Sequence, residues 1–281
     1  MDATRWQVGG NVLDLTNRSL LMGVLNVTPD SFSDGGEFFA TEAAAKHGVE
    51  MAQSGAAIID IGGESTRPGA EPVSPNDELS RVLPVIEQLA SSVPAHLSID
   101  TSKAAVARAA LAGGATIIND VTGGRGDPEM FALAAETGAA LIIMHMQGTP
   151  GTMQANPSYT DVVAEVADFF RQQFAEAVRY GIDPMCIAFD PGIGFGKTVA
   201  HNLELLAHLP QLRVENRPLV VGVSRKSFLG KISGPSDDRM SATVAMTSLL
   251  RERGAHVLRV HDVAANANAL RTTEALLAVT R

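Results

Sequence analysis

The chain has 281 residues, of which 45% are hydrophobic and 19% are charged, and its formal net charge is -9. This balance is that of a globular protein with a large apolar core. An acidic chain without a basic run repels polyanions, so the composition excludes nucleic acid as a partner.

Three further features of the sequence predict a cytoplasmic protein that does not bind membranes. The only cysteine is Cys186, which rules out an intramolecular disulfide and suits a reducing compartment. Apolar runs are all far shorter than the roughly 18 residues that span a bilayer. The first ten residues, MDATRWQVGG, also lack the pattern of a secretion signal.

Residues 1–19 predict an N-terminal β-hairpin extension, and residues 20–281 predict one further domain. In TRWQVGGNVLDLT, polar and apolar residues alternate on either side of Gly9 and Gly10. This pattern is typical of two short strands joined by a tight turn. We expect the hairpin to cover one end of the domain that follows.

Eight short apolar runs follow the hairpin, and alanine-rich segments with helical periodicity separate them. The runs lie at 20–26, 56–64, 96–100, 115–120, 140–145, 186–190, 219–226 and 256–261. Helices are expected at 41–53, 75–89, 103–111, 127–136, 159–179, 200–209, 238–252 and 264–279. Left-handed C-caps are expected at Gly55, Gly113, Gly138, Gly181 and Gly254. Nearly continuous apolar strands that alternate with helices predict a parallel sheet buried on both faces.

Eight such units in 281 residues predict an α/β fold, a single (β/α)8 TIM barrel. The alternative is an open doubly wound sheet, which would place its ligand near a glycine fingerprint. Unit count and length favour the barrel. In a barrel the active site lies at the carboxyl ends of the strands. The polar residues that the runs deliver to this rim are Asn26, Glu64, Asp100, Asn119, His145, Asp190, Lys226 and His261.

Three loops at this rim are rich in glycine, proline or both. Residues 26–36 and 62–72 suggest lids that close over a substrate, although a purely structural loop is an equal alternative for the first on composition alone. Residues 190–198, DPGIGFGKT, match neither a Walker A motif nor the dinucleotide fingerprint. They predict a tight turn that lets the backbone approach a flat ligand.

Basic side chains near the ends of the last two strands predict an anion site in this acidic protein. They are Arg225, Lys226, Arg259 and His261. The alternative is that Asp190 and Asp262 form ion pairs with them, and for Arg225 this is as well supported as contact with a ligand.

Asp100, Asn119 and Asp190 end three different strands, so their side chains can converge on the edge of a heterocycle. Asp100 could instead cap the following helix. Only His145 and His261 are histidines at strand ends, which argues against a tightly held zinc. A weakly bound Mg²⁺ that bridges a substrate diphosphate stays open.

Eight segments, in this order, resemble the dihydropteroate synthases of the folate pathway. They are NVTPDSFSDGG, IDIGGESTRPGA, SIDT, INDV, MHMQGTP, FDPGIGFGKT, GVSRKSFLG and RVHDV. The resemblance implies the eight-unit barrel. It also implies a transferase that joins 6-hydroxymethyl-7,8-dihydropterin diphosphate to 4-aminobenzoate, giving 7,8-dihydropteroate and diphosphate by an SN1-like route.

The resemblance assigns roles to individual residues. Pterin binding falls to Asp100, Asn119, Met144, Asp190, Lys226 and Arg259. Diphosphate binding falls to Asn26, Arg259 and His261, with Mg²⁺ at Asn26. The aminobenzoate site is formed by Phe32, Thr66, Arg67, Pro68, Phe195, Lys226 and Ser227. Asp34 would stabilise a cation on the pterin, so the catalytic set is Asp34, Lys226, Arg259 and Asn26.

The family also implies sensitivity to sulfonamides, which mimic aminobenzoate, and a homodimer formed through outer helices of the barrel. Two other functions are kept as alternatives. One is a methyltransferase that binds methyltetrahydrofolate on a similar barrel, and the other is a catalytically silent relative that binds pterin only. The segments SRKS and ESTRPGA, together with the anion site, favour the synthase over both.

Overall fold

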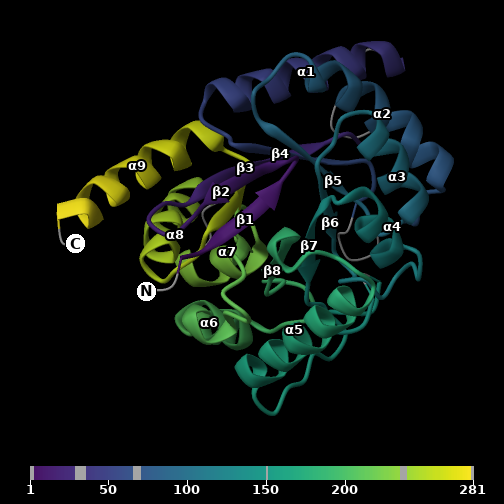
Figure 1. Ribbon diagram of the computed structural model, residues 1–281. Coiled ribbons are helices and arrows are strands. Elements are labelled where there is room, and N and C mark those ends of the chain that lie inside the picture. Colours follow the sequence, from purple (N-terminus) through teal and green to yellow (C-terminus); the bar gives the residue numbers. More distant parts are fainter. Residues whose placement is uncertain (1–2, 29–35, 66–70, 150, 235–238, 280–281) are drawn as a thin grey trace.

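The structure, a computed structural model, describes residues 3–28, 36–65, 71–149, 151–234 and 239–279. Eight parallel strands surround the centre of the molecule and helices cover their outer face (Figure 1). The strands are β3 (Leu20–Asn26), β4 (Ile58–Gly62), β5 (His96–Asp100), β6 (Ile117–Asp120), β7 (Ala140–Met144), β8 (Ile187–Asp190), β9 (Val220–Gly222) and β10 (Val257–Val260). The predicted barrel is confirmed.

Hydrogen bonds link the strands in the order β8-β7-β6-β5-β4-β3-β10-β9. A parallel bridge between Phe189 and Leu219 joins the two outer strands of this order, and the Phe189 N–H donates to the Pro218 carbonyl at 2.9 Å. The sheet is therefore closed between β8 and the start of β9 by a short contact.

The helices of the described residues follow the strands in alternation. They are α1 (Gly36–Gln53), α2 (Pro75–Ala90), α3 (Ala104–Ala112), α4 (Met130–Thr137), α5 (Val162–Arg179), α6 (Val199–Ala207), α7 (Ser227–Ser233), α8 (Met240–Glu252) and α9 (Val263–Val279), with 3-10 turns η2 (Pro184–Cys186) and η3 (Leu209–Leu212). The sequence analysis missed α7, a short helix that begins directly after Lys226. None of the described helices combines the length and apolar character needed to cross a bilayer.

Four of the five predicted left-handed glycines are confirmed, and Gly113 is wrong. Gly55, Gly138, Gly181 and Gly254 have φ angles between 65° and 109°. Gly113 keeps a right-handed conformation with φ -78°, and the next residue, Gly114, takes φ 115°. The helix therefore continues one residue further before the chain turns back to the sheet.

The hairpin consists of β1 (Arg5–Val8) and β2 (Asn11–Asp14), which pair antiparallel. Trp6 is completely buried and packs in one apolar cluster with Val8 and with inward-facing residues of the barrel strands, among them Ile58. The Trp6 indole N–H donates to the Cys186 carbonyl at 2.9 Å. The hairpin therefore covers the amino-terminal end of the barrel, as predicted. The domain boundary at residue 19 stays a prediction.

Candidate active site

Arg259 forms the centre of a polar cluster between the barrel strands. Its Nε donates to Asp60 Oδ2 at 2.6 Å, and its terminal nitrogen donates to Asp100 Oδ2 at 2.7 Å. The Asn119 amide donates to the same Asp60 oxygen at 3.0 Å. Strands β4, β5, β6 and β10 thus each contribute one side chain, which brings two of the predicted pterin residues into contact with Arg259 or with its partner.

The cluster is partly buried and rich in carboxyl groups. Asp60 is completely buried, and its second oxygen has no hydrogen-bond partner among the described residues. Burial raises the pKa of Asp100 to about 7. The positive charge of Arg259 opposes this rise, and the negative charge of Asp60 adds to it. The neighbouring carboxylates raise the pKa of Arg259 against the effect of its burial. The guanidinium therefore stays charged and holds two carboxyl groups together.

Asp190 and Lys226 approach the cluster from the next part of the rim. Asp190 Oδ1 accepts a hydrogen bond from the Gly192 N–H at 2.7 Å, which fixes the carboxylate at the end of β8. Burial raises the pKa of Asp190, and Lys226 opposes the shift. Burial lowers the pKa of Lys226 to about 8, although Asp190 favours its charged form. Lys226 therefore carries a positive charge at neutral pH.

The turn after β8 places an aromatic ring beside Lys226. The Lys226 Nζ donates to the Ile193 carbonyl and lies 4.7 Å from the centre of the Phe195 ring. Phe195 also packs against a cluster of buried apolar residues that contains Met144. Met144, a predicted pterin residue, and Phe195, a predicted aminobenzoate residue, therefore lie in one apolar cluster.

The positive charge at the rim is smaller than the sequence analysis predicted. Arg225 donates to both oxygens of Asp262, at 3.1 and 2.6 Å, so the ion-pair alternative for Arg225 holds. His261 Nδ1 lies 3.0 Å from Ser224 Oγ. Burial, followed by Arg259, lowers the pKa of His261 to about 4, so this ring is neutral at pH 7. The remaining positive groups beside it are Arg259 and Lys226.

The other predicted residues occupy different places. Asn26 is exposed at the last position of β3, and Ser227 is exposed at the first position of α7. Glu64 and Lys226 lie beyond the ends of β4 and β9, because these strands stop at Gly62 and Gly222. Five predicted residues lie outside the described part of the chain, namely Phe32, Asp34, Thr66, Arg67 and Pro68.

Two buried residues of the site were missed. Asp60 was overlooked because it lies inside an apolar strand, although one acid among buried apolar residues is a signal in itself. Lys197 was taken as part of a turn. Its Nζ is buried and lies 3.0 Å from His145 Nδ1, and it donates to the carbonyls of Gly192 and Phe195.

Lys197 has neutral partners. Burial lowers its pKa to about 7, and burial lowers the pKa of His145 to about 2, so the histidine accepts rather than donates at neutral pH. This lysine therefore fixes the turn that carries Phe195 against the end of β7. Within the described residues, no group of three or more histidine, cysteine, aspartate or glutamate side chains could hold a metal ion.

Comparison with known proteins agrees with this geometry. A family model described as pterin binding enzyme matches residues 22–261. Dihydropteroate synthase of Escherichia coli K12 is 47% identical over 270 residues, which are 95% of each chain. The chain belongs to the dihydropteroate synthase family of pterin-binding enzymes.

Two solved structures of the family superpose on nearly the whole chain. Dihydropteroate synthase of Xanthomonas albilineans with 4-aminobenzoic acid has a TM-score of 0.91 and 45% identity, and the match covers 99% of both chains. Dihydropteroate synthase of Yersinia pestis in a complex with a sulfonamide drug has a TM-score of 0.90 and 44% identity, and the match covers 98% of this chain and 99% of that one. Family membership therefore extends to the complete barrel with its hairpin.

Proposed function

We propose that this chain transfers the dihydropterin-methyl group of 6-hydroxymethyl-7,8-dihydropterin diphosphate to the amine of 4-aminobenzoate. The products are 7,8-dihydropteroate and diphosphate. The observation that carries the proposal is the cluster of Arg259 with Asp60, Asp100 and Asn119, next to Asp190 and Lys226, in a chain of this family. It offers a flat heterocycle both hydrogen-bond acceptors and donors within a partly buried site.

Pterin recognition uses the buried carboxylates. Asp190 has one oxygen held by Gly192, so its carboxylate is fixed for the guanidine-like edge of the ring, where two N–H groups donate. Lys226 would donate to the ring oxygen and nitrogen, while Asp100 and Asn119 meet the other edge. Met144 would pack beside the ring. Because these groups lie on packed strands or next to them, little of their order has to be created on binding.

Diphosphate binding uses groups that face outward from the cluster. Arg259 donates from Nε and from one terminal nitrogen to carboxylates, and within the described residues its other N–H groups are left for phosphate oxygens. Its side chain is 21% exposed, whereas that of Asp60 is completely buried. Asn26 and His261 would complete this half of the site.

The donor set fits a magnesium ion that is held mainly by the substrate. Asn26 supplies an amide oxygen at an exposed strand end, and Mg²⁺ in such sites keeps few protein ligands besides substrate phosphates. When bound, the ion would neutralise charge that develops on the leaving diphosphate. We therefore propose Mg²⁺ as the cofactor, with Asn26 as its contact in the protein.

The reaction is an SN1-like substitution. The bond between the exocyclic carbon and the diphosphate oxygen breaks first, because the electron-rich dihydropterin stabilises the cation and Arg259 stabilises the leaving group. The nitrogen of aminobenzoate then forms a bond to that carbon and loses a proton. Asp34 is proposed to stabilise the cation. The weakly basic amine needs orientation more than activation.

Aminobenzoate is proposed to bind beside Phe195, Lys226 and Ser227. Thr66, Arg67, Pro68 and Phe32 would complete this second site. Phe195 already lies against the Lys226 ammonium, which gives an aromatic ring and a positive charge at one place. A sulfonamide would bind there in place of aminobenzoate.

We also propose a cytoplasmic homodimer. Apolar side chains stay exposed on the two last helices, with Leu249 of α8 at 47% and Leu276 of α9 at 63%. Helices α8 and α9 pack against each other on the outside of the barrel (Figure 1), so a partner copy could cover both. The single cysteine, Cys186, is free and buried, which suits a reducing compartment.

The test is product formation from the pterin diphosphate and 4-aminobenzoate with Mg²⁺, with and without sulfamethoxazole. We expect dihydropteroate and inhibition that is competitive with aminobenzoate. A folded protein that binds the pterin diphosphate but forms no product would be the silent relative. Methyl transfer from methyltetrahydrofolate would instead support the methyltransferase alternative.

A further inference from the structure

The side chain of Lys197 connects three points of the backbone at the carboxyl end of β8. Within the turn of residues 191–197, its Nζ donates to the Gly192 carbonyl at 3.1 Å and to the Phe195 carbonyl at 3.0 Å. The same Nζ donates to the His145 carbonyl at 3.3 Å, directly after β7. One buried side chain therefore ties both ends of the turn to the neighbouring strand end.

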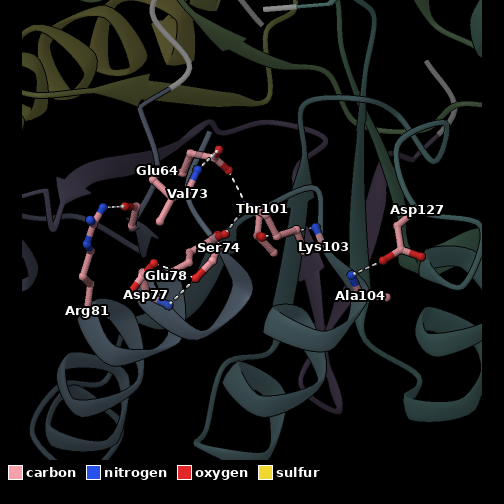
Figure 2. Close-up of polar contacts among 11 residues, drawn as sticks. Glu64, Val73, Ser74, Asp77, Glu78, Arg81, Thr101, Lys103, Ala104 and Asp127 are labelled. Carbon is pink, nitrogen blue, oxygen red and sulfur yellow. Dashed lines mark hydrogen bonds and ion pairs between the residues drawn. The ribbon is translucent and has the colours of Figure 1, made fainter. Parts of the chain in front are cut away.

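The partners of Lys197 differ from those of Lys103, which follows β5. Lys103 Nζ donates to the carboxylates of Glu64 and Glu78, and the Glu78 side chain is completely buried (Figure 2). These ion pairs offset the cost of burying a carboxylate. The hydrogen-bond acceptors of Lys197 among the described residues are neutral, namely three carbonyls and the neutral imidazole of His145. What Lys197 contributes is therefore the order of the turn rather than the balance of a buried charge.

A second set of contacts holds the same turn against the segment between β7 and α5. The Tyr159 hydroxyl donates to the Gly196 carbonyl at 2.8 Å, and the Gln154 amide donates to the Gly194 carbonyl at 2.5 Å. Gly196 has a φ of 62°, and a Cβ atom there would lie 2.7 Å from the Gln147 carbonyl oxygen. Only glycine permits so close an approach of the two backbones.

The turn is also in contact with Lys226. The Lys226 Nζ donates to the Ile193 carbonyl and lies 4.7 Å from the centre of the Phe195 ring. A Cβ atom at Gly194 would lie 3.2 Å from Lys226 Cδ, so the turn packs along the alkyl part of this side chain. The position of the turn therefore determines where the aromatic ring meets the ammonium group.

We propose that Lys197 and Tyr159 are positioning residues for 4-aminobenzoate and for sulfonamides. The inference rests on the proposed function, in which Phe195 and Lys226 belong to the aminobenzoate site. Lys197 acts through the Phe195 carbonyl, and Tyr159 acts through the carbonyl of the next residue, Gly196. Both hydrogen bonds hold the backbone that carries the Phe195 ring.

Pterin binding depends less on these two side chains. The Asp190 carboxylate is fixed by the Gly192 N–H at 2.7 Å. The carbonyl that accepts from Lys226 belongs to Ile193, which is completely buried in the main apolar core. Phe195 is only half-buried, so its position depends more on the hydrogen bonds of the turn. Loss of either positioning residue is therefore expected to separate the two substrates, which a general loss of folded protein would not do.

The first variant is Tyr159→Phe, which removes one hydrogen bond and keeps the ring. We expect KM for 4-aminobenzoate to rise about fivefold, and the inhibition constant of sulfamethoxazole to rise in parallel. KM for the pterin diphosphate should stay within about twofold. The matched control is Tyr180→Phe at the end of α5, where the Tyr180 ring packs edge-on against Phe131. This control should leave both KM values unchanged.

Lys197→Met removes the other connection and keeps the length of the alkyl chain. We expect KM for 4-aminobenzoate to rise about tenfold or more, because the hydrogen bonds to both ends of the turn are lost. KM for the pterin diphosphate should rise less than about threefold. The control is Lys46→Met on α1, since Lys46 is exposed and should affect neither KM.

Two results would overturn the proposal while leaving the proposed function intact. In one, wild type forms dihydropteroate and KM for 4-aminobenzoate is the same in wild type, Tyr159→Phe and Lys197→Met. In the other, both variants raise the two KM values equally, as general damage to the fold would. If wild type forms no dihydropteroate at all, the proposed function itself fails, so the two failures are distinguishable.

Discussion

The two ends of this barrel are made of opposite kinds of side chain. At the amino-terminal end, the hairpin brings Trp6 onto an apolar cluster with Ile58 and Ile117, and the indole N–H is satisfied by a carbonyl. At the carboxyl end, Arg259 draws Asp60 and Asp100 together in a partly buried site.

The change from one kind to the other happens within two residues of a single strand. Ile58 of β4 belongs to the apolar cluster, and Asp60, on the same face of the strand, belongs to the polar cluster. The first cluster gains stability from buried apolar area, whereas the second retains charges that cost free energy to bury. The comparison indicates that this fold keeps stability and chemistry at separate ends.

Arg259→Met should have the largest effect, because it damages the chemistry and also leaves Asp60 and Asp100 uncompensated. We expect loss of kcat/KM by about a thousandfold or more and loss of about 3–5 kcal/mol in the free energy of unfolding. Steady-state kinetics and urea denaturation measure the two quantities. Arg225→Gln, which removes an exposed ion pair, should cost less than about 1 kcal/mol and is the control for stability. Retained activity in Arg259→Met would refute the assigned role.

Trp6→Ala tests the other end. We expect loss of about 3–5 kcal/mol in the free energy of unfolding, since a completely buried indole leaves a large cavity. Both KM values should stay unchanged at a temperature where the variant is folded. Val12→Ala, on the exposed side of the same hairpin, should change stability by less than about 0.5 kcal/mol. A raised KM in folded Trp6→Ala would show that the ends are coupled.

Lys197→Met tests the lowered pKa of a buried lysine by the pH dependence of stability. The folded-state pKa is lowered from 10.5 to about 7, so between these values the unfolded state binds more protons than the folded state. Stability therefore rises with pH through this window in wild type. The variant lacks this group, so the difference in stability, wild type minus variant, should increase from pH 7 to 10.5 and be constant below. Denaturation series at several pH values measure it, and a flat difference would contradict the lowered pKa of Lys197 in the folded state.

His261 gives the smallest and most local effect. Its pKa is lowered to about 4 without ligand, and the negative charge of a bound diphosphate should raise it. Binding of diphosphate at about pH 6 should therefore be accompanied by uptake of up to about one proton by this ring. Calorimetry in buffers of different ionisation enthalpy measures the uptake. His261→Gln should lower it, and equal uptake in wild type and variant would exclude this ring from the anion site.

The fold was predictable because its signals are local and repeated. Buried strands such as 140–144 are continuously apolar, and helices end at glycine, so eight units could be counted along the chain. The misses have a local cause as well. Helix α7 is short and starts at Ser227 without a side-chain cap. The left-handed residue after α3 is Gly114 and not the predicted Gly113, because a glycine stands at both positions and either can adopt a positive φ.

The site was predictable only as far as it lies at strand ends. Asp100, Asn119 and Asp190 could be placed at the rim from their positions, and Arg259 from the charge beside them. Asp60 and Lys197 could not, because their importance comes from partners far away in the sequence, such as Arg259 and His145. The neutral state of His261 also depends on burial, which the sequence does not state.

The most direct test of the central claim is dihydropteroate formation by wild type and Lys226→Ala, together with the free energy of unfolding of each. Lys226 is half-buried beside polar groups of the rim and its pKa is lowered to about 8, so the folded protein does not depend on its charge for stability. We predict robust product from wild type and severe loss of turnover in the variant, with stability unchanged or higher. Equal turnover in both proteins would contradict the claim that the carboxyl end of the barrel is the active site.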